Sequence, residues 1–353
     1  MTADPILTLA WLILAHLVAD FILQTSGVVA AKTARDGRAW RGFLGHAAGV
    51  AICLVPAVLA FGMWGAIALG VIVLSHVVID QLKIVATRRT EAAALAEARR
   101  RHEGAAPAAG LGRAWTPLPA AWFILDQVAH IAVLGVVWAV WLAGTALTPG
   151  WSSGVAAVTG GWDQQLFHQV MLTVVIVIAL LIANVRGGAI FVATLVRPLE
   201  VGDELAGGGP AGVAASRDAT GDDTGSAAAP AAGRGWSIRF GLLSGRVVAD
   251  PAPADLPVPG ARPTDGDILG ERVMLPPPAR VGATIGVLER LLIVTFVLVG
   301  ADAAIGFVIA AKTIARFRQL DDRDFAEYYL LGTLASVSVA IVTGLIARAA
   351  LNA

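Results

Sequence analysis

The chain has 353 residues, of which 57% are hydrophobic and only 15% are charged. A soluble domain has about a quarter of its residues charged, so this composition excludes an ordinary soluble enzyme and indicates a membrane protein. Lys plus Arg equals Asp plus Glu at 26 each, so no overall charge excess points to nucleic acid. The single Cys53 excludes an intrachain disulfide and a Cys-rich metal site, so any metal would need His and carboxylate ligands.

Apolar runs of about 20 residues recur along the chain, and this is the length of a helix that crosses a lipid bilayer. Lipid gives backbone polar groups no partners, and the alternating pattern of barrel strands is absent, so these runs predict α-helices. The predicted spans are residues 5–24, 43–61, 64–85, 120–143, 166–196, 281–311 and 325–351. In the fifth span the sequence Asn-Val-Arg-Gly-Gly at residues 184–188 interrupts the apolar run, so this segment is predicted to be either kinked or re-entrant.

Residues 197–280 differ in composition from the rest of the chain, because they are rich in Gly, Ala, Pro and Asp. Such a composition predicts a cytoplasmic or interfacial insertion that is largely disordered. Within it, residues 236–248 and 268–275 favour strands of a small ordered module. The predicted fold is an all-α polytopic membrane protein with about seven transmembrane helices. Its parts are a four-helix bundle over 1–143, a fifth membrane segment over 144–196, the linker over 197–280, and C-terminal membrane helices over 281–353.

Lys and Arg are distributed unevenly among the short loops. The loops between the first and second spans and between the third and fourth are basic, whereas the loop between the fourth and fifth has no Lys or Arg. Basic loops usually stay in the cytoplasm, so both are predicted to be cytoplasmic and the N-terminus to lie outside. If the fifth segment crosses the membrane, the basic residues 312–323 would lie outside, which the same rule disfavours; a re-entrant fifth segment would remove the conflict.

Pairs of histidine and aspartate are the most informative feature of the apolar runs. Four of the six histidines lie in the first four runs, and three of these have an aspartate four positions away. A separation of four residues puts both side chains on one face of a helix. The pairs are His16 with Asp20, His76 with Asp80, and Asp126 with His130, while His46 has no such partner.

These residues also share a depth in the membrane. Consecutive helices of the predicted bundle run in opposite directions. One side of the bundle therefore contains the end of the first helix, the start of the second, the end of the third and the start of the fourth. The predicted topology puts this side near the cytoplasmic leaflet. A charged side chain at a span centre costs about 2.5–3.5 kcal/mol, and less near the interface, so several aspartates need compensation. Imidazole and carboxylate ligands suit Zn²⁺ or a similar divalent ion. The pattern therefore favours a metal site, with a proton or ion relay and a structural hydrogen-bond network as open alternatives.

Several longer motifs carry a resemblance to a known family. They are His16-Leu-Val-Ala-Asp20-Phe-Ile-Leu-Gln24 with Lys32 and His46, Ser75-His76-Val-Val-Ile-Asp80-Gln-Leu-Lys83, Gly286-Val-Leu-Glu289-Arg290-Leu-Leu, Ala311-Lys312-Thr-Ile-Ala-Arg316-Phe317 and Glu327-Tyr328-Tyr-Leu-Leu-Gly332-Thr333. Over nearly everything outside the linker, the chain resembles a bacterial integral-membrane family known as domain of unknown function 3307. The resemblance implies a multi-pass protein of the bacterial inner membrane and names no activity. In ligand type and spacing alone, the His-x3-Asp pairs are similar to those of zinc-dependent phospholipases C and nucleases of the same fold, and of small inner-membrane metal-dependent hydrolases.

The preferred interpretation is a metal-dependent hydrolase of a phosphoester or lipid-like substrate, with membrane lipids as partners. One or two divalent ions, with Zn²⁺ favoured, would be held by His16, Asp20, His46, His76, Asp80, Asp126 and His130. Lys83 is predicted to offset substrate charge, and Gln24 to orient water or a ligand. A transporter or proton-coupled carrier that uses the same residues, and a non-catalytic membrane scaffold, remain open. Outside this set, the sequence predicts buried ion pairs of Glu289 and Arg290 with Lys312, Arg316 or Glu327, and no part in the site for His102 and His168.

Overall fold

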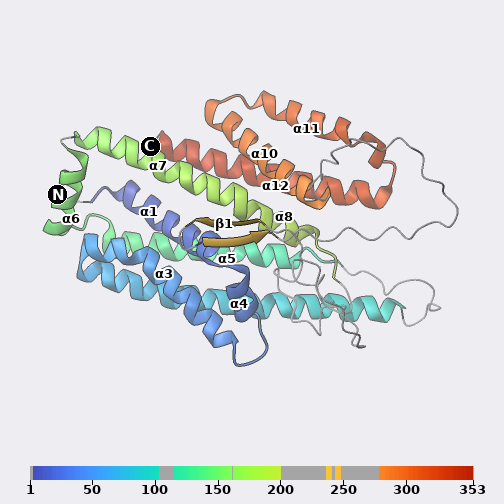
Figure 1. Cartoon of the computed structure of the whole chain (residues 1–353), viewed down its shortest axis with the longest axis horizontal. Helices are drawn as coiled ribbons and strands as arrows, with labels where there is room; N and C mark the ends of the chain where they lie inside the picture. Colours follow the sequence, from blue (N-terminus) through green and yellow to red (C-terminus); the bar gives the residue numbers. More distant parts are fainter. Residues whose placement is uncertain are drawn as a thin grey trace. The chain divides into compact units, whose positions relative to one another are not determined.

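The computed structural model is almost entirely helical, and it describes residues 3–102, 115–160, 162–199, 236–240, 243–247 and 278–352 (Figure 1). The chain divides into two compact units, Met1–Ser216 with Pro277–Ala353, and Arg217–Pro276. Within the described residues, 7 helices are long and apolar enough to cross a membrane. The prediction of an all-α, multi-pass membrane protein is therefore confirmed.

The N-terminal helices form the bundle that carries the histidines and aspartates. The elements are α1 (Pro5–Leu17), which continues into the π-helical segment η1 (Val18–Leu23), the short α2 (Ser26–Lys32), α3 (Ala39–Phe61), α4 (Met63–His102), and α5 (Leu118–Val137) with its π-helical end η2 (Trp138–Leu142). The Asp4 carboxylate caps α1 by accepting a hydrogen bond of 3.0 Å from the Leu7 backbone N–H, and Pro5 occupies the first turn. These features fix where the first span begins.

The connection between α3 and α4 depends on two glycines. Gly62, between the two helices, has a φ of +58°, which an L side chain rarely adopts. At Gly65, a Cβ atom would lie 2.2 Å from the Ala57 carbonyl oxygen, so a larger residue would push the two helices apart. The glycines thus allow the end of α3 and the first turn of α4 to pack side by side.

The helix α4 is longer than the apolar run that predicts it. The run ends at Val85, whereas the helix continues to His102. Residues 86–102 are rich in Ala, Glu and Arg, which are strong helix formers, and the Glu97 carboxylate accepts a hydrogen bond of 2.8 Å from Arg100. The predicted boundary at residue 85 is therefore a boundary of hydropathy and not of the helix.

The fifth membrane segment follows the short α6 (Pro149–Thr159) and is one continuous helix. α7 (Gln164–Ile182) passes through the π-helical segment η3 (Ala183–Gly187) into α8 (Gly188–Val196), and together they form a single candidate span of 33 residues. The buried Asn184 side chain donates hydrogen bonds to the Leu180 carbonyl oxygen at 3.0 Å and to the Thr343 hydroxyl oxygen at 3.1 Å. The polar interruption is thus accommodated in a π-helical turn, and the chain does not reverse there.

The C-terminal part differs from the prediction of one helix over residues 281–311. α10 (Pro278–Val299) ends at Gly300, whose φ is +75°, and a second helix, α11 (Ala303–Ala315), begins after it. The short 3-10 turn η4 (Phe317–Gln319) leads into α12 (Arg323–Leu351). The single-helix prediction is wrong because the apolar composition continues across a glycine that turns the chain.

The helices α10 and α12 run in the same direction. Arg290 donates to the Ser336 hydroxyl at 3.0 Å, and further along both helices Arg348 donates to the Val297 carbonyl oxygen at 3.1 Å. The connecting α11 must therefore return the chain to the side on which α10 begins. The basic residues 312–323 then lie on the side where α8 ends, so the predicted conflict with the distribution of positive charge disappears without a re-entrant fifth segment.

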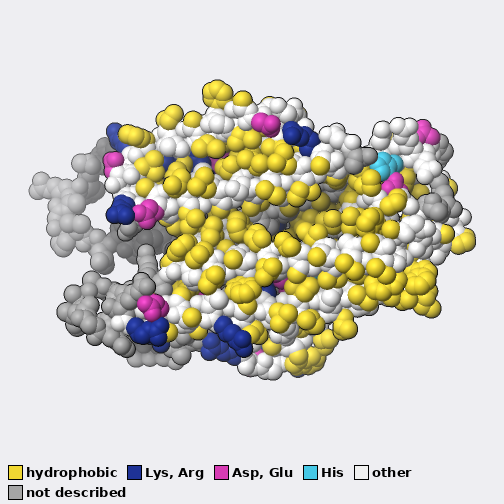
Figure 2. All heavy atoms as spheres, turned by 180° about the vertical axis from the view of Figure 1, so that it is seen from behind, with side chains coloured by type: hydrophobic (Ala, Val, Ile, Leu, Met, Phe, Trp, Pro, Cys, Tyr) yellow, Lys and Arg dark blue, Asp and Glu magenta, His cyan; other side chains and the backbone are white. Residues whose placement is uncertain are grey.

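The surface is divided by polarity in the way that a bilayer requires. Figure 2 shows a face on which hydrophobic side chains cover the middle of the molecule, while most of the visible Lys and Arg side chains lie toward one end. Exposed apolar residues on successive helices include Leu44, Leu74, Leu125 and Leu334. In water such a surface would be unfavourable, whereas lipid acyl chains cover it at no cost.

The second unit contains one described element, a β-hairpin. Strands β1 (Trp236–Phe240) and β2 (Leu243–Val247) pair antiparallel, with Trp236 opposite Val247 and Phe240 opposite Leu243. The strand prediction for residues 236–248 thus matches a strand pair. The predicted strand at 268–275 and the predicted disorder in the remainder of 197–280 lie outside the described residues, apart from residues 197–199 and 278–280, of which the latter begin α10.

Candidate metal centre

The seven predicted ligands come from four helices and meet in one buried cluster. His16 and Asp20 come from α1 and η1, His46 from α3, and the other four from α4 and α5. All seven side chains are at most 8% exposed. The groups close enough to share an ion are His16–Asp20–His76, His46–His76–Asp80 and Asp20–Asp126–His130. The up-down arrangement of the bundle therefore does bring these residues together.

The centre of the cluster is a triangle of two imidazole nitrogens and one carboxylate oxygen. The Nε2 atoms of His46 and His76 lie 2.8 Å apart, and Asp20 Oδ1 lies 3.3 Å and 3.1 Å from them. Asp80 Oδ2 lies 3.5 Å from His46 Nε2 and 3.9 Å from His76 Nε2. Ligands at 2.0–2.1 Å from a tetrahedral ion are about 3.3 Å from one another, so the separations within the triangle, and those from Asp80 Oδ2 to the two imidazole nitrogens, are close to those of a metal site.

One atom of this triangle lacks an ordinary partner. Asp20 Oδ1 is buried and accepts no hydrogen bond within the described residues, although two imidazole nitrogens face it. A buried carboxylate oxygen without a partner is costly. A cation bound between Asp20, His46 and His76 would remove that cost, so the donor set fits a divalent ion such as Zn²⁺.

A second group of polar atoms adjoins the triangle. The His130 Nδ1–H donates to the Asp126 carbonyl oxygen at 2.8 Å, which leaves a lone pair on His130 Nε2. That nitrogen and Asp126 Oδ1 are both buried, and neither has a hydrogen-bond partner among the residues that the structure describes. The His76 and His130 ring centroids are 4.1 Å apart. These atoms are candidates for a second ion position.

Gln127, which the sequence analysis did not identify, connects the two groups. Its amide nitrogen donates to Asp126 Oδ2 at 3.0 Å and to Asp20 Oδ2 at 3.3 Å, and its amide oxygen lies 3.3 Å from His16 Nε2. With the amide in this orientation, His16 Nε2 is the donor to Gln127. Gln127 follows Asp126 directly in the sequence, but no spacing pattern indicated that it would face two carboxylates.

Two lysines neutralise the remaining carboxylate charge. Lys83, a predicted site residue, donates to Asp126 Oδ2 at 2.8 Å. Lys32, which entered the sequence pattern only as part of a family motif, is buried and forms a direct ion pair with Asp80. With its amide nitrogen facing the Asp20 carbonyl oxygen at 3.1 Å, Gln24 accepts a hydrogen bond from Lys32 at 3.1 Å. Gln24 thus positions Lys32.

Lys32 reaches the cluster because α2 packs tightly on α3. A Cβ atom at Gly42 would lie 2.4 Å from the Lys32 backbone nitrogen and 2.8 Å from the Ala31 carbonyl carbon. Only glycine permits this approach. The α2 helix is short and is capped by Thr25, whose hydroxyl accepts a weak hydrogen bond of 3.4 Å from the Val28 backbone N–H.

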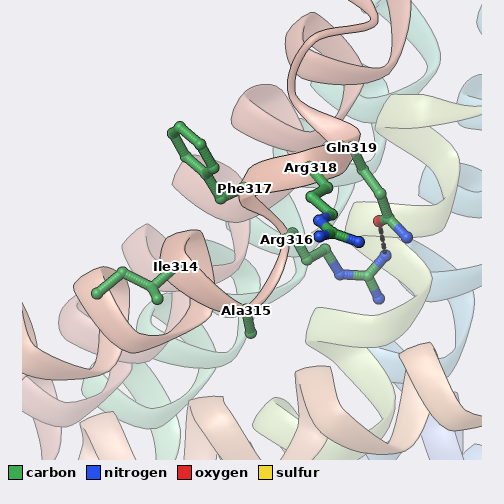
Figure 3. Close-up of a pocket in the computed structure, with 6 residues that line it drawn as sticks. All are labelled: Ile314, Ala315, Arg316, Phe317, Arg318 and Gln319. Atoms are coloured by element: carbon green, nitrogen blue, oxygen red, sulfur yellow. Dashed lines mark hydrogen bonds between the residues drawn. The ribbon is translucent and has the colours of Figure 1, made fainter.

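A cavity of about 420 Å³ opens beside the cluster. Its inner wall includes Asp20, Asp80, Lys83 and Gln127, so the site is accessible from it. Its walls come from η1, α2, α4, α5, η3 and α8. A separate hollow of about 560 Å³ is lined by the six consecutive residues Ile314, Ala315, Arg316, Phe317, Arg318 and Gln319 (Figure 3). It contains no His or carboxylate side chain and is not part of the metal centre.

Polar residues elsewhere in the bundle form their own contacts. Lys312 pairs with Glu289 at 2.5 Å, which confirms the predicted ion pair. Arg290 is buried and donates to the Asn184 carbonyl oxygen at 2.7 Å and to the Ser336 hydroxyl. Among the described residues it does not form the predicted ion pair with a carboxylate. His168 forms an ion pair with Asp4, away from the cluster, and the side chain of His102 lies outside the described residues.

The comparisons with known proteins bear on the N-terminal part of the chain. No curated protein and no solved structure matches the chain. The C-terminal motifs, from residue 286 onward, lie outside the matched residues, so that part of the resemblance stays a prediction. Residues 8–154, which hold all seven predicted ligands, match the model of the family described as Protein of unknown function (DUF3307), and this supports the resemblance over those residues.

Proposed function

We propose that this chain is an integral-membrane, metal-dependent hydrolase of a phosphoester or lipid-like substrate. The observation that carries the proposal is the triangle of Asp20 Oδ1, His46 Nε2 and His76 Nε2 beside an open cavity. Its atoms have the spacing of metal ligands, and its carboxylate oxygen has no hydrogen-bonded partner in the described chain. An enzyme requires both a set of ligands and an approach for substrate.

The roles of the residues follow from their contacts. Asp20, His46, His76 and Asp80 would hold the ion, and a divalent ion supplies Lewis-acid polarisation of a scissile phosphoryl group. Gln127 orients Asp20 and Asp126 by donating to both. Lys83 lines the cavity and donates to Asp126 at 2.8 Å, so offsetting the charge of a phosphoester, the predicted role, would be shared with its charge balance of that carboxylate.

The distribution of polar groups favours a one-sided site over a transport path. On α1, α3, α4 and α5, the buried residues on the far side of the cluster are apolar, and they include Leu12, Val50, Leu54, Ile72, Leu134 and Val137. A proton or ion carrier needs polar groups that continue to the opposite face. The described interior beyond the cluster is a packed hydrophobic core instead. The alternative of a non-catalytic scaffold explains neither the ligand set nor the cavity.

Elemental analysis and a hydrolysis assay test the proposal together. The purified full chain is expected to contain about one divalent ion or more per molecule and to hydrolyse a chromogenic phosphoester, with activity lost on chelation and restored by Zn²⁺. His76→Ala should lose both properties. His168→Ala is the matched control, since that histidine pairs with Asp4 outside the cluster and should keep both. A wild-type protein that binds no divalent ion would overturn the proposal and favour a structural or relay network.

A further inference from the structure

We propose that the cavity beside the metal centre binds the phosphate-bearing head group of a membrane amphiphile, with the apolar chain against its hydrophobic wall. The inference rests on the proposed function, because it names the class of substrate for that site. The binding itself requires neither a metal nor hydrolysis. It is carried by the charge and the lining of the cavity.

The cavity has an excess of cationic side chains. Five of its lining residues are Lys32, Lys83, Arg88, Arg186 and Arg197, and three are the carboxylates Asp20, Asp80 and Glu91. Lys32 and Lys83 are paired with Asp80 and Asp126. The two lysines therefore balance the charge of the metal centre, and binding of a ligand of opposite charge depends on Arg88 and Arg186.

Two of these arginines bind only neutral groups. Arg88 donates to the Thr33 carbonyl oxygen at 2.6 Å, and Arg186 donates through Nε to the Phe21 carbonyl oxygen at 3.3 Å. Within the described chain neither forms an ion pair with a carboxylate. A guanidinium group has five N–H donors in a planar fork that fits phosphate oxygens in pairs. Each therefore has donors left for an anion in the cavity, and the two come from different helices, α4 and η3.

The bond from Arg186 links the anion position to the metal centre. Its acceptor, Phe21, follows Asp20 in the last turn of η1, where backbone carbonyl groups lack a partner within the helix. Asp20 itself lines the same cavity. A phosphate group held by Arg186 would thus lie close to the carboxylate that is proposed to bind the ion.

The rest of the lining is apolar, and this selects an amphiphile over a soluble phosphate. Two aromatic side chains, Phe21 and Phe123, lie on one part of the wall, and the small residues Ala189 and Ala193 of α8 lie one helical turn apart on another. Ile84 and Ile190 extend this surface. A soluble phosphoester would leave the apolar wall in contact with water, whereas an acyl chain would cover it.

The direct test is a binding titration with the purified full chain in neutral detergent. The probe is phosphatidic acid with a fluorescent acyl chain, and the competitors are unlabelled phosphatidic acid, diacylglycerol, glycerol 3-phosphate and inorganic phosphate. Arg88→Gln and Arg186→Gln are each expected to weaken binding about tenfold, because each removes a charge-assisted contact. Arg316→Gln is the matched control, because Arg316 donates to Gln319 in the separate hollow of Figure 3 and should bind like wild type.

Two further variants make the outcome decisive. Ala193→Trp fills the cavity from an exposed position on α8 and should block binding without removing any charge. His76→Ala should still bind the probe while failing to hydrolyse it, so loss of the metal centre and loss of the lipid site give different results. Binding that is equal in wild type, Arg88→Gln, Arg186→Gln and Ala193→Trp would overturn the inference. Competition by diacylglycerol as strong as by phosphatidic acid would exclude phosphate recognition, and competition by inorganic phosphate as strong as by the lipid would show a soluble source.

Discussion

The residues of the cluster show how a charged group is kept inside an apolar bundle. Asp80 forms an ion pair with Lys32, and Asp126 forms one with Lys83. Each of these aspartates also lies beside a histidine four residues away on its own helix. Asp20 differs, because its side-chain partners among the described residues are three histidines and a long hydrogen bond from Gln127, with no lysine. Among the three carboxylates, Asp20 is therefore the one without a lysine partner, and its substitution is the most informative.

Asp20→Asn separates a metal site from a hydrogen-bond network. A network tolerates Asn, which keeps the size and the hydrogen-bonding capacity of Asp, and a hydrogen bond between side chains of membrane helices contributes only about 0.6 kcal/mol on average. A metal site does not, since an ion present at about 100 times its Kd stabilises the folded state by about 2.7 kcal/mol. We expect chelation to lower the wild-type Tm by roughly 5 °C and to leave the Tm of Asp20→Asn unchanged. Equal responses in the two proteins would contradict the metal site.

Gln127 is expected to act as a positioning residue. Gln127→Leu removes the donor to Asp20 and Asp126, and loss of such an outer contact typically lowers metal affinity about 10–100-fold. The ion should still bind at saturation, which distinguishes this variant from a lost ligand. Competition against a chelating dye measures the affinity, and Gln319→Leu, on the exposed turn after α11, serves as the control. Unchanged affinity in Gln127→Leu would remove Gln127 from the site.

At the scale of elements, the cluster depends on how closely short helices approach long ones. The α2 helix lies against α3 only because residue 42 is glycine, and this contact places Lys32 beside Asp80. The π-helical segments η1 and η3 meet in a comparable way, with Arg186 donating to Phe21 and the Phe21 ring within 3.4 Å of a Cβ position at Gly187. Small residues and local helix irregularities therefore set the geometry of the charged groups.

Gly42→Ala tests this dependence. The added methyl group would overlap the backbone of α2, so we expect a loss of about 1–3 kcal/mol of stability together with weaker metal binding. Gly45→Ala, one helical turn away, has nothing within 4 Å of the new atom and should be neutral or slightly stabilising. Thermal melting in detergent compares the two. Equal melting temperatures would show that α2 does not rely on this contact.

At the scale of the whole molecule, the described basic segments around residues 35, 99 and 312–323 lie on one side. The parallel course of α10 and α12 returns residues 312–323 to the side where α8 ends. With the basic segments around residues 35 and 99 predicted to be cytoplasmic, we propose that the metal centre lies near the cytoplasmic leaflet of a bacterial inner membrane and that the N-terminus lies outside.

Labelling of single cysteines tests this topology. In a Cys53→Ala background, Arg35→Cys, Arg99→Cys and Arg318→Cys should all be protected from an impermeant thiol reagent added to intact cells. Ser153→Cys, in α6 on the opposite side, should react. Reaction of Arg318→Cys would mean that α11 does not return the chain, and reaction of Arg35→Cys would invert the proposed orientation.

The sequence predicted those features that depend on local pattern. Apolar length predicted the spans, and the four-residue spacing of His76 and Asp80 predicted a shared helix face, because both depend only on residues close in sequence. The pairing of Lys32 with Asp80 depends on an approach between backbones at Gly42, which hydropathy does not encode. The break at Gly300 was missed because the residues on both sides are equally apolar. Both errors arise where a glycine acts through three-dimensional geometry.

The length of α4 has a mechanical consequence. Its 40 residues make a helix of about 60 Å, roughly twice the thickness of the hydrocarbon layer. His76, Asp80 and Lys83 therefore share one uninterrupted rod with residues 86–102, where Leu95 packs against Leu199 beyond the end of α8. No loop separates these two parts of α4. A force that displaces residues 86–102 would therefore tilt or rotate the part of the helix that carries His76 and Asp80.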